Sequence, residues 1–248
     1  MTAPVEHIAP AQWPVAILAG GVGTRLRPLT EKIPKALVPV AGEPFLAHQL
    51  RLLRRQGFRK VVLCGGYLGE MIEAEFGGGE RFDLRIEYSF DGPRLLLTGG
   101  SLKRALPQLG DKFLVLYGDS YLPIDYMGPL GAFLASGKPA LMTVYKNEGK
   151  WDSSNVRFEG GEIRAYDKTK RTPEMQHIDY GLGVLRSTVF ASWPEGEPFE
   201  LEKVYQRLVT EKQLAGHEVK QRFYEIGSPQ GLSELDSVLR RDDISIPR

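Results

Sequence analysis

Short apolar runs and amphipathic segments alternate along the chain from residue 14 onward. Residues 15–18, Val-Ala-Ile-Leu, form an unbroken apolar run that ends in Ala-Gly-Gly. This pattern is typical of a strand that is buried on both faces. Residues 61–64 and 113–117 have the same character, and residues 85–88 alternate as a strand does. These segments predict the strands of a mostly parallel sheet.

Between these runs, apolar side chains recur at helical spacing. The spacing predicts a helix over residues 44–56 that is closed by Gly57. Further helices are expected at residues 69–76 and 98–106, with Thr98 as the N-cap of the second. The alternation of strands and helices predicts an α/β fold, with a Rossmann-like, mostly parallel sheet covered by helices on both faces.

The pattern changes after residue 141, where a smaller antiparallel lobe is expected. Residues 156–164 alternate around a Gly-Gly pair, which indicates a β-hairpin. The remaining elements expected here are strands at 181–185 and 222–225 and helices at 200–212 and 229–239. We expect a single domain over residues 14–240, divided into a first part (about 14–140), a second part (about 141–228) and a C-terminal helix (229–240).

Composition and charge exclude several classes of protein. The 248 residues contain 32 Lys and Arg against 31 Asp and Glu, so a net charge of +1 gives no global attraction to nucleic acid or anionic membranes. The single cysteine, Cys64, lies in an apolar run, which suggests a buried thiol in a reducing compartment. No run has the length of a membrane span or the pattern of a signal peptide. We expect a cytoplasmic protein that binds neither nucleic acid nor a membrane.

A glycine-rich turn follows the first apolar run. Gly20, Gly21 and Gly23 match neither a P-loop nor the full Rossmann fingerprint. Their backbone amides nevertheless come at the carboxyl end of a parallel strand, where such amides suit phosphate oxygens. Arg25 adds a planar guanidinium for phosphate. On the glycines alone, a phosphate-binding loop and a simple tight turn both fit.

The longer segment that contains these glycines carries a resemblance. Residues 20–40 read GGVGTRLRPLTEKIPKALVPV. This resembles the signature of the sugar-1-phosphate nucleotidylyltransferases, GGxGTRLxPLTxxxPKxLxPV, and the likeness continues at lower density to about residue 239. The segments at 117–120 and 226–229 look most like those of heptose-1-phosphate guanylyltransferases and N-acetylmuramate-1-phosphate uridylyltransferases.

The resemblance implies transfer of a nucleoside monophosphate from a nucleoside triphosphate to a sugar 1-phosphate. Pyrophosphate is released, and the NDP-sugar formed serves cell-surface polysaccharide synthesis. The GTP and heptose 1-phosphate type is favoured, with UTP and CTP as alternatives, and a homodimer is compatible with the sequence. Because no covalent enzyme intermediate is needed, catalysis rests on positioning and on neutralising phosphate charge.

The resemblance also implies roles for particular residues. Arg25 would contact the leaving pyrophosphate, and Lys35 would contact the α-phosphate. Together with Asp119 they form the expected catalytic set. The residues expected to bind the nucleotide are Leu18, Ala19, Gly20, Gly21, Gly23, Thr24, Thr98, Gly99 and Gly100.

The expected cofactor is Mg²⁺, which prefers carboxylate, phosphate and water oxygens. Asp119 follows an apolar strand and a glycine, and it matches the first metal aspartate of the family. The second metal aspartate of the family is replaced here by Glu225. Glu225 is therefore the expected second ligand, with an ordinary surface glutamate as the alternative.

The acceptor residues depart from the family pattern. Lys168 matches the lysine that holds the sugar phosphate, although the flanking residues differ. Asp179 and Gly181 match an Asn-x-Gly element that contacts the sugar, and the carboxylate of Asp179 can only accept hydrogen bonds. Near the expected base pocket, Leu97 stands where the family has glycine.

The sequence also bears on two other classes of protein. A non-catalytic regulatory paralogue would keep this fold, and the departures at Asp179 and Glu225 are compatible with it. A glycosyltransferase of the related fold would carry an Asp-x-Asp motif, which this sequence lacks.

Overall fold

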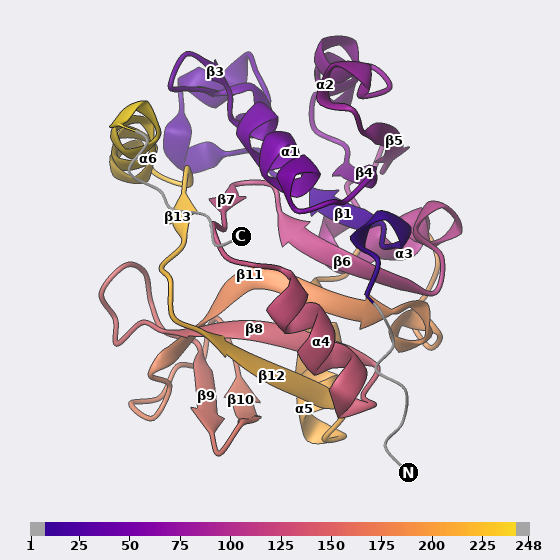
Figure 1. Cartoon of the computed structure of the whole chain (residues 1–248), viewed down its shortest axis with the longest axis vertical. Coiled ribbons are helices and arrows are strands. Elements are labelled where there is room, and N and C mark those ends of the chain that lie inside the picture. The colour runs from indigo at the N-terminus through magenta and orange to yellow at the C-terminus, as the bar shows by residue number, and fades with distance from the viewer. Residues whose placement is uncertain (1–7, 242–248) are drawn as a thin grey trace.

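A computed structural model describes residues 8–241, and in this part of the chain nine strands form one continuous sheet (Figure 1). The strand order is β5-β4-β1-β6-β11-β8-β12-β10-β9. These strands are β1 (Val15–Leu18), β4 (Lys60–Gly65), β5 (Arg85–Phe90), β6 (Lys112–Tyr117), β8 (Ala140–Lys146), β9 (Val156–Glu159), β10 (Glu162–Tyr166), β11 (His177–Arg186) and β12 (Leu214–Val219).

The first half of the sheet is parallel, as the sequence predicts. β1 pairs in parallel with β4 and β6, and β4 pairs in parallel with β5. Leu18 therefore lies beside Tyr117, at the end of both strands. The loops that follow β1 and β6 consequently leave the sheet at the same edge, which is where ligands bind in open α/β sheets.

Helices cover both faces of the sheet, which confirms the predicted fold class. Val15 and Ile17 of β1 belong to one hydrophobic core, and Ala16 between them belongs to the other. α1 and α4 lie on the near face in Figure 1, and α3 and α5 lie behind the sheet. The helices are α1 (Phe45–Arg55), α2 (Gly69–Phe76), α3 (Leu97–Leu109), α4 (Met127–Ser136), α5 (Leu201–Thr210) and α6 (Pro229–Arg241).

The second half of the sheet is mostly antiparallel, as expected for the smaller lobe, but it contains one parallel pair. β11 runs antiparallel to both β6 and β8, but β12 runs parallel to β8. The predicted hairpin is present as β9 and β10, and its Gly160 and Gly161 both have positive φ, at 59° and 80°. Such values suit the tight turn that joins two antiparallel strands.

Short strands outside the main sheet position the site. They are β2 (Pro39–Val40), β3 (Glu43–Pro44), β7 (Ser120–Tyr121) and β13 (Tyr224–Glu225). β13 pairs with β7, so Glu225 lies opposite Ser120, the neighbour of Asp119. α6 follows β13 and lies beside β2 and β3 (Figure 1). Over residues 8–241, the structure has no helix with the length and apolar character that a membrane span requires.

Candidate active site

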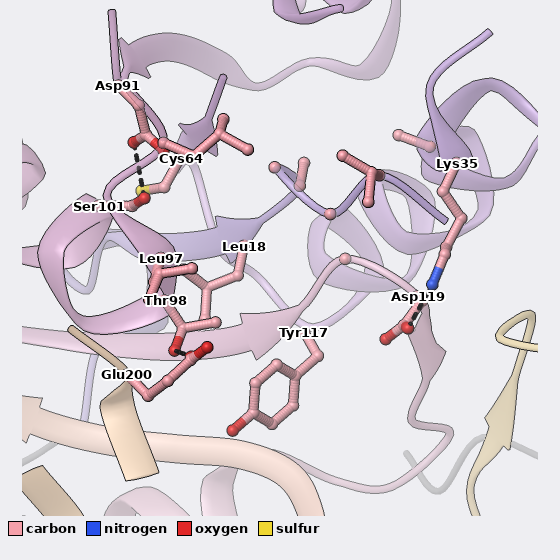
Figure 2. Close-up of a pocket in the computed structure, with 17 residues that line it drawn as sticks. Leu18, Lys35, Cys64, Asp91, Leu97, Thr98, Ser101, Tyr117, Asp119 and Glu200 are labelled. Carbon is pink, nitrogen blue, oxygen red and sulfur yellow. Dashed lines mark hydrogen bonds and ion pairs between the residues drawn. The ribbon is translucent and has the colours of Figure 1, made fainter. Parts of the chain in front are cut away.

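A cavity of about 330 Å³ opens at the carboxyl edge of β1 and β6 (Figure 2). Strand ends, the glycine-rich loop and the start of α3 supply most of its lining. Of the residues expected to bind the nucleotide, Leu18, Ala19, Gly20, Gly21 and Thr98 line this cavity. Lys35 and Asp119 lie together at one end of it. We call it the nucleotide cavity.

Close backbone packing explains why the loop after β1 needs glycine. A Cβ atom at Gly20 would lie 2.7 Å from the Cα of Gly65, so no larger residue fits without movement. Gly23 has a φ of 61°, and its carbonyl accepts a hydrogen bond from the Thr30 hydroxyl at 2.7 Å. A Cβ at Gly21 would meet no atom within 4 Å, so this part of the loop faces open space. The loop therefore presents bare backbone to the cavity.

Lys35 and Asp119 form an ion pair at one end of the nucleotide cavity. The Lys35 Nζ lies 2.9 Å from Asp119 Oδ2, and both side chains are partly exposed. Figure 2 shows the two side chains pointing toward each other from different elements. The expected α-phosphate contact and the expected metal ligand are thus brought together at one point.

Glu225 and Arg25 lie beside this pair. The backbone N–H of Ile226 donates to the Asp119 carbonyl at 2.9 Å, which fixes β13 next to the Asp119 loop. A Cβ at Gly227 would lie 2.7 Å from a guanidinium nitrogen of Arg25 and 3.6 Å from Glu225 Oε1. Burial raises the pKa of the Glu225 carboxyl, and the negative charges of Asp119 and Asp152 raise it further. The positive charges of Arg25 and Lys35 lower this pKa by less, so the net shift is upward. Such a carboxyl gains from a nearby cation.

A second cavity, of about 240 Å³, lies on the other side of Asp119. We call it the acceptor cavity because all three expected acceptor residues, Lys168, Asp179 and Gly181, line it together with Glu225. Its other lining residues are Tyr117, Asp119, Ser120, Asp152, Ser153, Asn155, Arg171, Ile178, Tyr180 and Phe223. Tyr117 and Asp119 line both cavities, so the two cavities meet at these residues.

Internal hydrogen bonds hold the polar groups of the acceptor cavity. Asp179 accepts hydrogen bonds from the Tyr166 hydroxyl at 3.0 Å, the Tyr117 hydroxyl at 3.3 Å and the Gly181 amide at 3.1 Å. The Lys168 Nζ lies 4.8 Å from the centre of the Tyr117 ring and 3.3 Å from its hydroxyl oxygen. Burial and the charge of Asp179 raise the pKa of Tyr117. The network therefore keeps Tyr117 neutral and places Lys168 over its ring.

Thr98 has a different role from the predicted one. It is not the N-cap of α3, because α3 begins at Leu97 and the carboxylate of Asp91 accepts from the Leu96 amide at 2.9 Å. The Thr98 hydroxyl instead accepts from the amide of Leu201 at 2.8 Å and donates to Glu200, at the start of α5 (Figure 2). Local capping rules fail here because the partners lie about a hundred residues away in sequence.

Four expected nucleotide residues lie outside the lining of the nucleotide cavity. Gly99 and Gly100 are buried, and their amides donate to the Phe199 carbonyl at 2.8 and 3.1 Å. Gly23 and Thr24 belong to the outer turn of the glycine-rich loop, and they too are absent from the lining. These residues shape the cavity from behind or beside it.

Several lining residues were not singled out from the sequence. Asp91 and Glu200 line the nucleotide cavity, and Tyr117 separates the two cavities. Tyr117 directly precedes the Gly-Asp pair, which is a signal that could have been used. Glu200 and the acceptor residues Asn155 and Arg171 lie in no recognisable motif, so only the tertiary fold brings them in.

The protein has an α/β fold with two adjoining cavities at the carboxyl edge of the parallel half of its sheet. A family model described as nucleotidyl transferase matches residues 15–237, so the chain belongs to the nucleotidyl transferase family. The predicted resemblance to sugar-1-phosphate nucleotidylyltransferases is thereby confirmed at the level of the family.

The similar proteins include both uridylyltransferases and guanylyltransferases. The UTP–glucose-1-phosphate uridylyltransferase of Synechocystis is 30% identical over 201 residues, with 75% of this chain and 52% of that protein covered. The chain therefore spans about half the length of that relative. The N-acetylmuramate alpha-1-phosphate uridylyltransferase of Neisseria meningitidis is 28% identical over 228 residues, covering 90% of this chain and 96% of that protein.

A guanylyltransferase shows comparable similarity. The D-glycero-alpha-D-manno-heptose 1-phosphate guanylyltransferase of Campylobacter jejuni is 28% identical over 215 residues, covering 86% of this chain and 94% of that protein. The crystal structure of HddC from Yersinia pseudotuberculosis complexed with GMP-PN superposes with a TM-score of 0.74 at 22% identity, covering 92% of this chain and 99% of that one. This structural likeness supports the predicted fold.

Proposed function

We propose that the protein transfers a nucleoside monophosphate from a nucleoside triphosphate to a sugar 1-phosphate, with release of pyrophosphate and formation of an NDP-sugar. The observation that carries the proposal is that the nucleotide and acceptor cavities meet at Asp119. Transfer between two bound substrates requires their reacting phosphates to lie within contact distance, and adjoining cavities supply that proximity. The family and the names of the relatives support the same reaction class.

The charges around this junction suit phosphate transfer. The glycine-rich loop would hold the triphosphate with backbone N–H groups, and Arg25 would bind the leaving pyrophosphate. Lys35 would leave Asp119 and turn its ammonium to the α-phosphate, where it neutralises charge that develops in the transition state. On the acceptor side, Lys168 would hold the sugar phosphate with its oxygen directed at the α-phosphorus. Asp179 and Gly181 would lie against the sugar.

The residues present fit a hard divalent cation such as Mg²⁺. Asp119 and Glu225 offer carboxylates on paired segments, and burial of Glu225 favours a cation beside it. Over the described residues 8–241, no group of three or more protein ligands could hold a metal. The two carboxylates would therefore hold the ion together with phosphate and water oxygens, which is the usual environment of Mg²⁺. When bound, Mg²⁺ would neutralise phosphate charge and help to align the triphosphate.

For the nucleotide base and the sugar, we propose one favoured pair and keep the alternatives. The resemblance at residues 117–120 and 226–229 favours GTP with a heptose 1-phosphate, and UTP or CTP are the alternatives. A cytoplasmic location and a homodimer stay predictions.

The test is pyrophosphate release in Mg²⁺ with each of the four nucleoside triphosphates, combined with a panel of sugar 1-phosphates. Turnover with one base and one class of sugar 1-phosphate would support the proposal, and excess EDTA should abolish it. Asp119→Asn keeps the shape of the side chain and should remove most of the turnover while the far-UV circular dichroism stays unchanged. Nucleotide binding without turnover for any pair would favour a non-catalytic regulatory paralogue.

A further inference from the structure

One loop, residues 147–155 between β8 and β9, forms a side of the acceptor cavity. Asp152 and Ser153 of this loop line the cavity. Asn147 is fully buried beneath the loop, where its Nδ2 donates to the Asp152 carbonyl at 2.5 Å and its Oδ1 accepts from the Trp151 amide at 3.2 Å. Asn147 therefore holds the backbone of the loop at residues 151 and 152.

The side chain of Trp151 is held differently from the backbone of the loop. Trp151 is 47% exposed, so burial in the core does not fix its position. Its ring lies against Arg222 instead, with the guanidinium carbon 3.4 Å from the ring centre. The same guanidinium carbon lies 4.5 Å from the centre of the Tyr224 ring. A guanidinium stacks on aromatic faces through its flat, weakly hydrated surface.

Arg222 is itself fixed by a carboxylate on another element. Its two terminal nitrogens donate to the two carboxylate oxygens of Glu234, at 2.8 and 3.0 Å. Glu234 lies on α6, and this two-point geometry sets the plane of the guanidinium. The Trp151 ring therefore stacks on the Arg222 guanidinium, and Glu234 on α6 fixes the orientation of that guanidinium.

The stack joins the two segments that enclose the acceptor. Tyr224 and Glu225 form β13, and Glu225 lines the same cavity as Asp152 and Ser153. We propose that Arg222 and Trp151 are positioning residues for the acceptor, because their stack holds the 147–155 loop against β13 and so keeps Asp152 and Ser153 at the bound sugar 1-phosphate. This inference rests on the proposed function, and it assigns specific residues to the acceptor side of the reaction.

The test is to measure the KM for the sugar 1-phosphate and the KM for the nucleoside triphosphate separately in each variant. Arg222→Ala and Trp151→Ala should each raise the KM for the sugar 1-phosphate about 2- to 30-fold, the range that loss of a cation–π contact predicts. The KM for the nucleoside triphosphate should stay unchanged, because neither residue lines the nucleotide cavity. Arg222→Lys keeps the positive charge but loses the flat stacking surface, so its KM for the sugar 1-phosphate should lie between those of wild type and Arg222→Ala.

The chain supplies a matched control. Arg81 lies over the rings of Phe76 and Phe82, at 4.9 and 4.8 Å, and pairs with Glu75 at 2.9 Å. This arrangement resembles that of Arg222, but Arg81 lines neither substrate cavity. Arg81→Ala should leave both KM values unchanged. Equal rises in both KM values for Arg222→Ala, or a rise for Arg81→Ala as large as that for Arg222→Ala, would overturn the inference.

Hydrogen–deuterium exchange of the substrate-free protein gives a second readout that does not depend on activity. Residues 147–155 should exchange faster in Arg222→Ala than in wild type, and Arg81→Ala should leave this segment unchanged. Unaltered exchange in Arg222→Ala would overturn the proposed role of the stack. Failure of the proposed function has a different signature, because the wild-type protein would then turn over no pair of substrates.

Discussion

The nucleotide cavity and the acceptor cavity share Asp119 and Tyr117 but are built in different ways. Backbone and apolar side chains make up much of the nucleotide cavity, which includes the glycine-rich loop and three leucines. The acceptor cavity is lined largely by charged and polar side chains from separate segments of the chain.

Cavities lined by backbone and cavities lined by polar side chains suit different parts of a substrate. Backbone amides suit the phosphates that every nucleoside triphosphate carries, so one loop sequence serves many nucleotidyl transferases. Hydroxyl patterns differ between sugars and have to be matched by side chains. The chain departs from the family pattern at Asp179 and Glu225 in the acceptor cavity, and at Leu97 in the nucleotide cavity.

The largest effect is expected at Lys35, which lines the nucleotide cavity and pairs with Asp119, one of the two residues at which the cavities meet. Removing one preorganised cation that faces developing charge lowers turnover by about 10²- to 10³-fold. Lys35→Ala should therefore reduce kcat by this factor, with a smaller change in nucleotide affinity measured by calorimetry. Lys32→Ala is the control, because Lys32 is exposed on the same segment and lines neither cavity. Near-wild-type kcat in Lys35→Ala would show that the signature does not have its family role here.

A smaller and more selective effect is expected at Lys168. Loss of charge-assisted hydrogen bonds to the sugar phosphate should raise the KM for the sugar 1-phosphate about 10- to 100-fold in Lys168→Ala. The KM for the nucleotide should not change, since Lys168 lines only the acceptor cavity. Lys170→Ala, two residues along the same loop and outside the cavity lining, should behave as wild type. A matching rise in the nucleotide KM would contradict the division of the site into two cavities.

The same contrast explains what could be predicted from the sequence. Residues 15–18 were predicted as a strand with the observed bounds, because four apolar residues before glycines leave few alternatives. One contiguous signature also predicted that the glycine-rich loop and Lys35 lie together, and the structure places Gly20, Gly21 and Lys35 in the lining of one cavity. By contrast, the sequence analysis did not predict β12. Apolar and polar residues show no clear alternation in its sequence, Leu-Ala-Gly-His-Glu-Val. Its parallel partner in the sheet, β8, also lies far from it in the sequence.

The acceptor side shows why the remaining residues were missed. Asn155 orders the site by accepting from the Asp179 amide at 2.9 Å, a contact between residues 24 positions apart. Arg171 lies in an exposed polar stretch that looks like any solvated loop. No local pattern marks either residue, because their positions depend on strand pairing across the second half of the sheet.

Glu225 tests whether the junction between the cavities holds a metal. Glu225→Gln keeps the shape of the side chain but removes its charge, so it should raise the Mg²⁺ concentration needed for half-maximal rate. Glu225→Asp should also raise it, because its carboxylate would fall short by about 1.5 Å, the length of one bond. The backbone cannot easily compensate, since β13 is bonded to β7 and to the Asp119 carbonyl. Wild-type Mg²⁺ dependence in both variants would make Glu225 a bystander.

The smallest effect is on the stability of the protein without substrates or Mg²⁺. Burial raises the pKa of Glu225 above its ordinary 4.5, so over the window from 4.5 up to the raised value the folded state binds more protons than the unfolded state. The contribution of Glu225 to stability therefore falls as the pH rises through this window. Glu225→Gln removes the buried charge and should have a higher Tm than wild type at pH 7, with a difference that shrinks as the pH falls toward 4.5.

The exposed Glu73 on α2 supplies the control, and Glu73→Gln should show no such pH-dependent difference. Adding Mg²⁺ and the nucleoside triphosphate should reverse the order of Tm, because ligand binding stabilises the folded state that it prefers and the glutamine variant binds the ion less well. A Glu225→Gln variant that is less stable than wild type at pH 7 without ligands would show that the carboxylate is satisfied by the protein alone. The junction would then hold its charges as a closed network of ion pairs, and the metal would depend on Asp119, the phosphates and water.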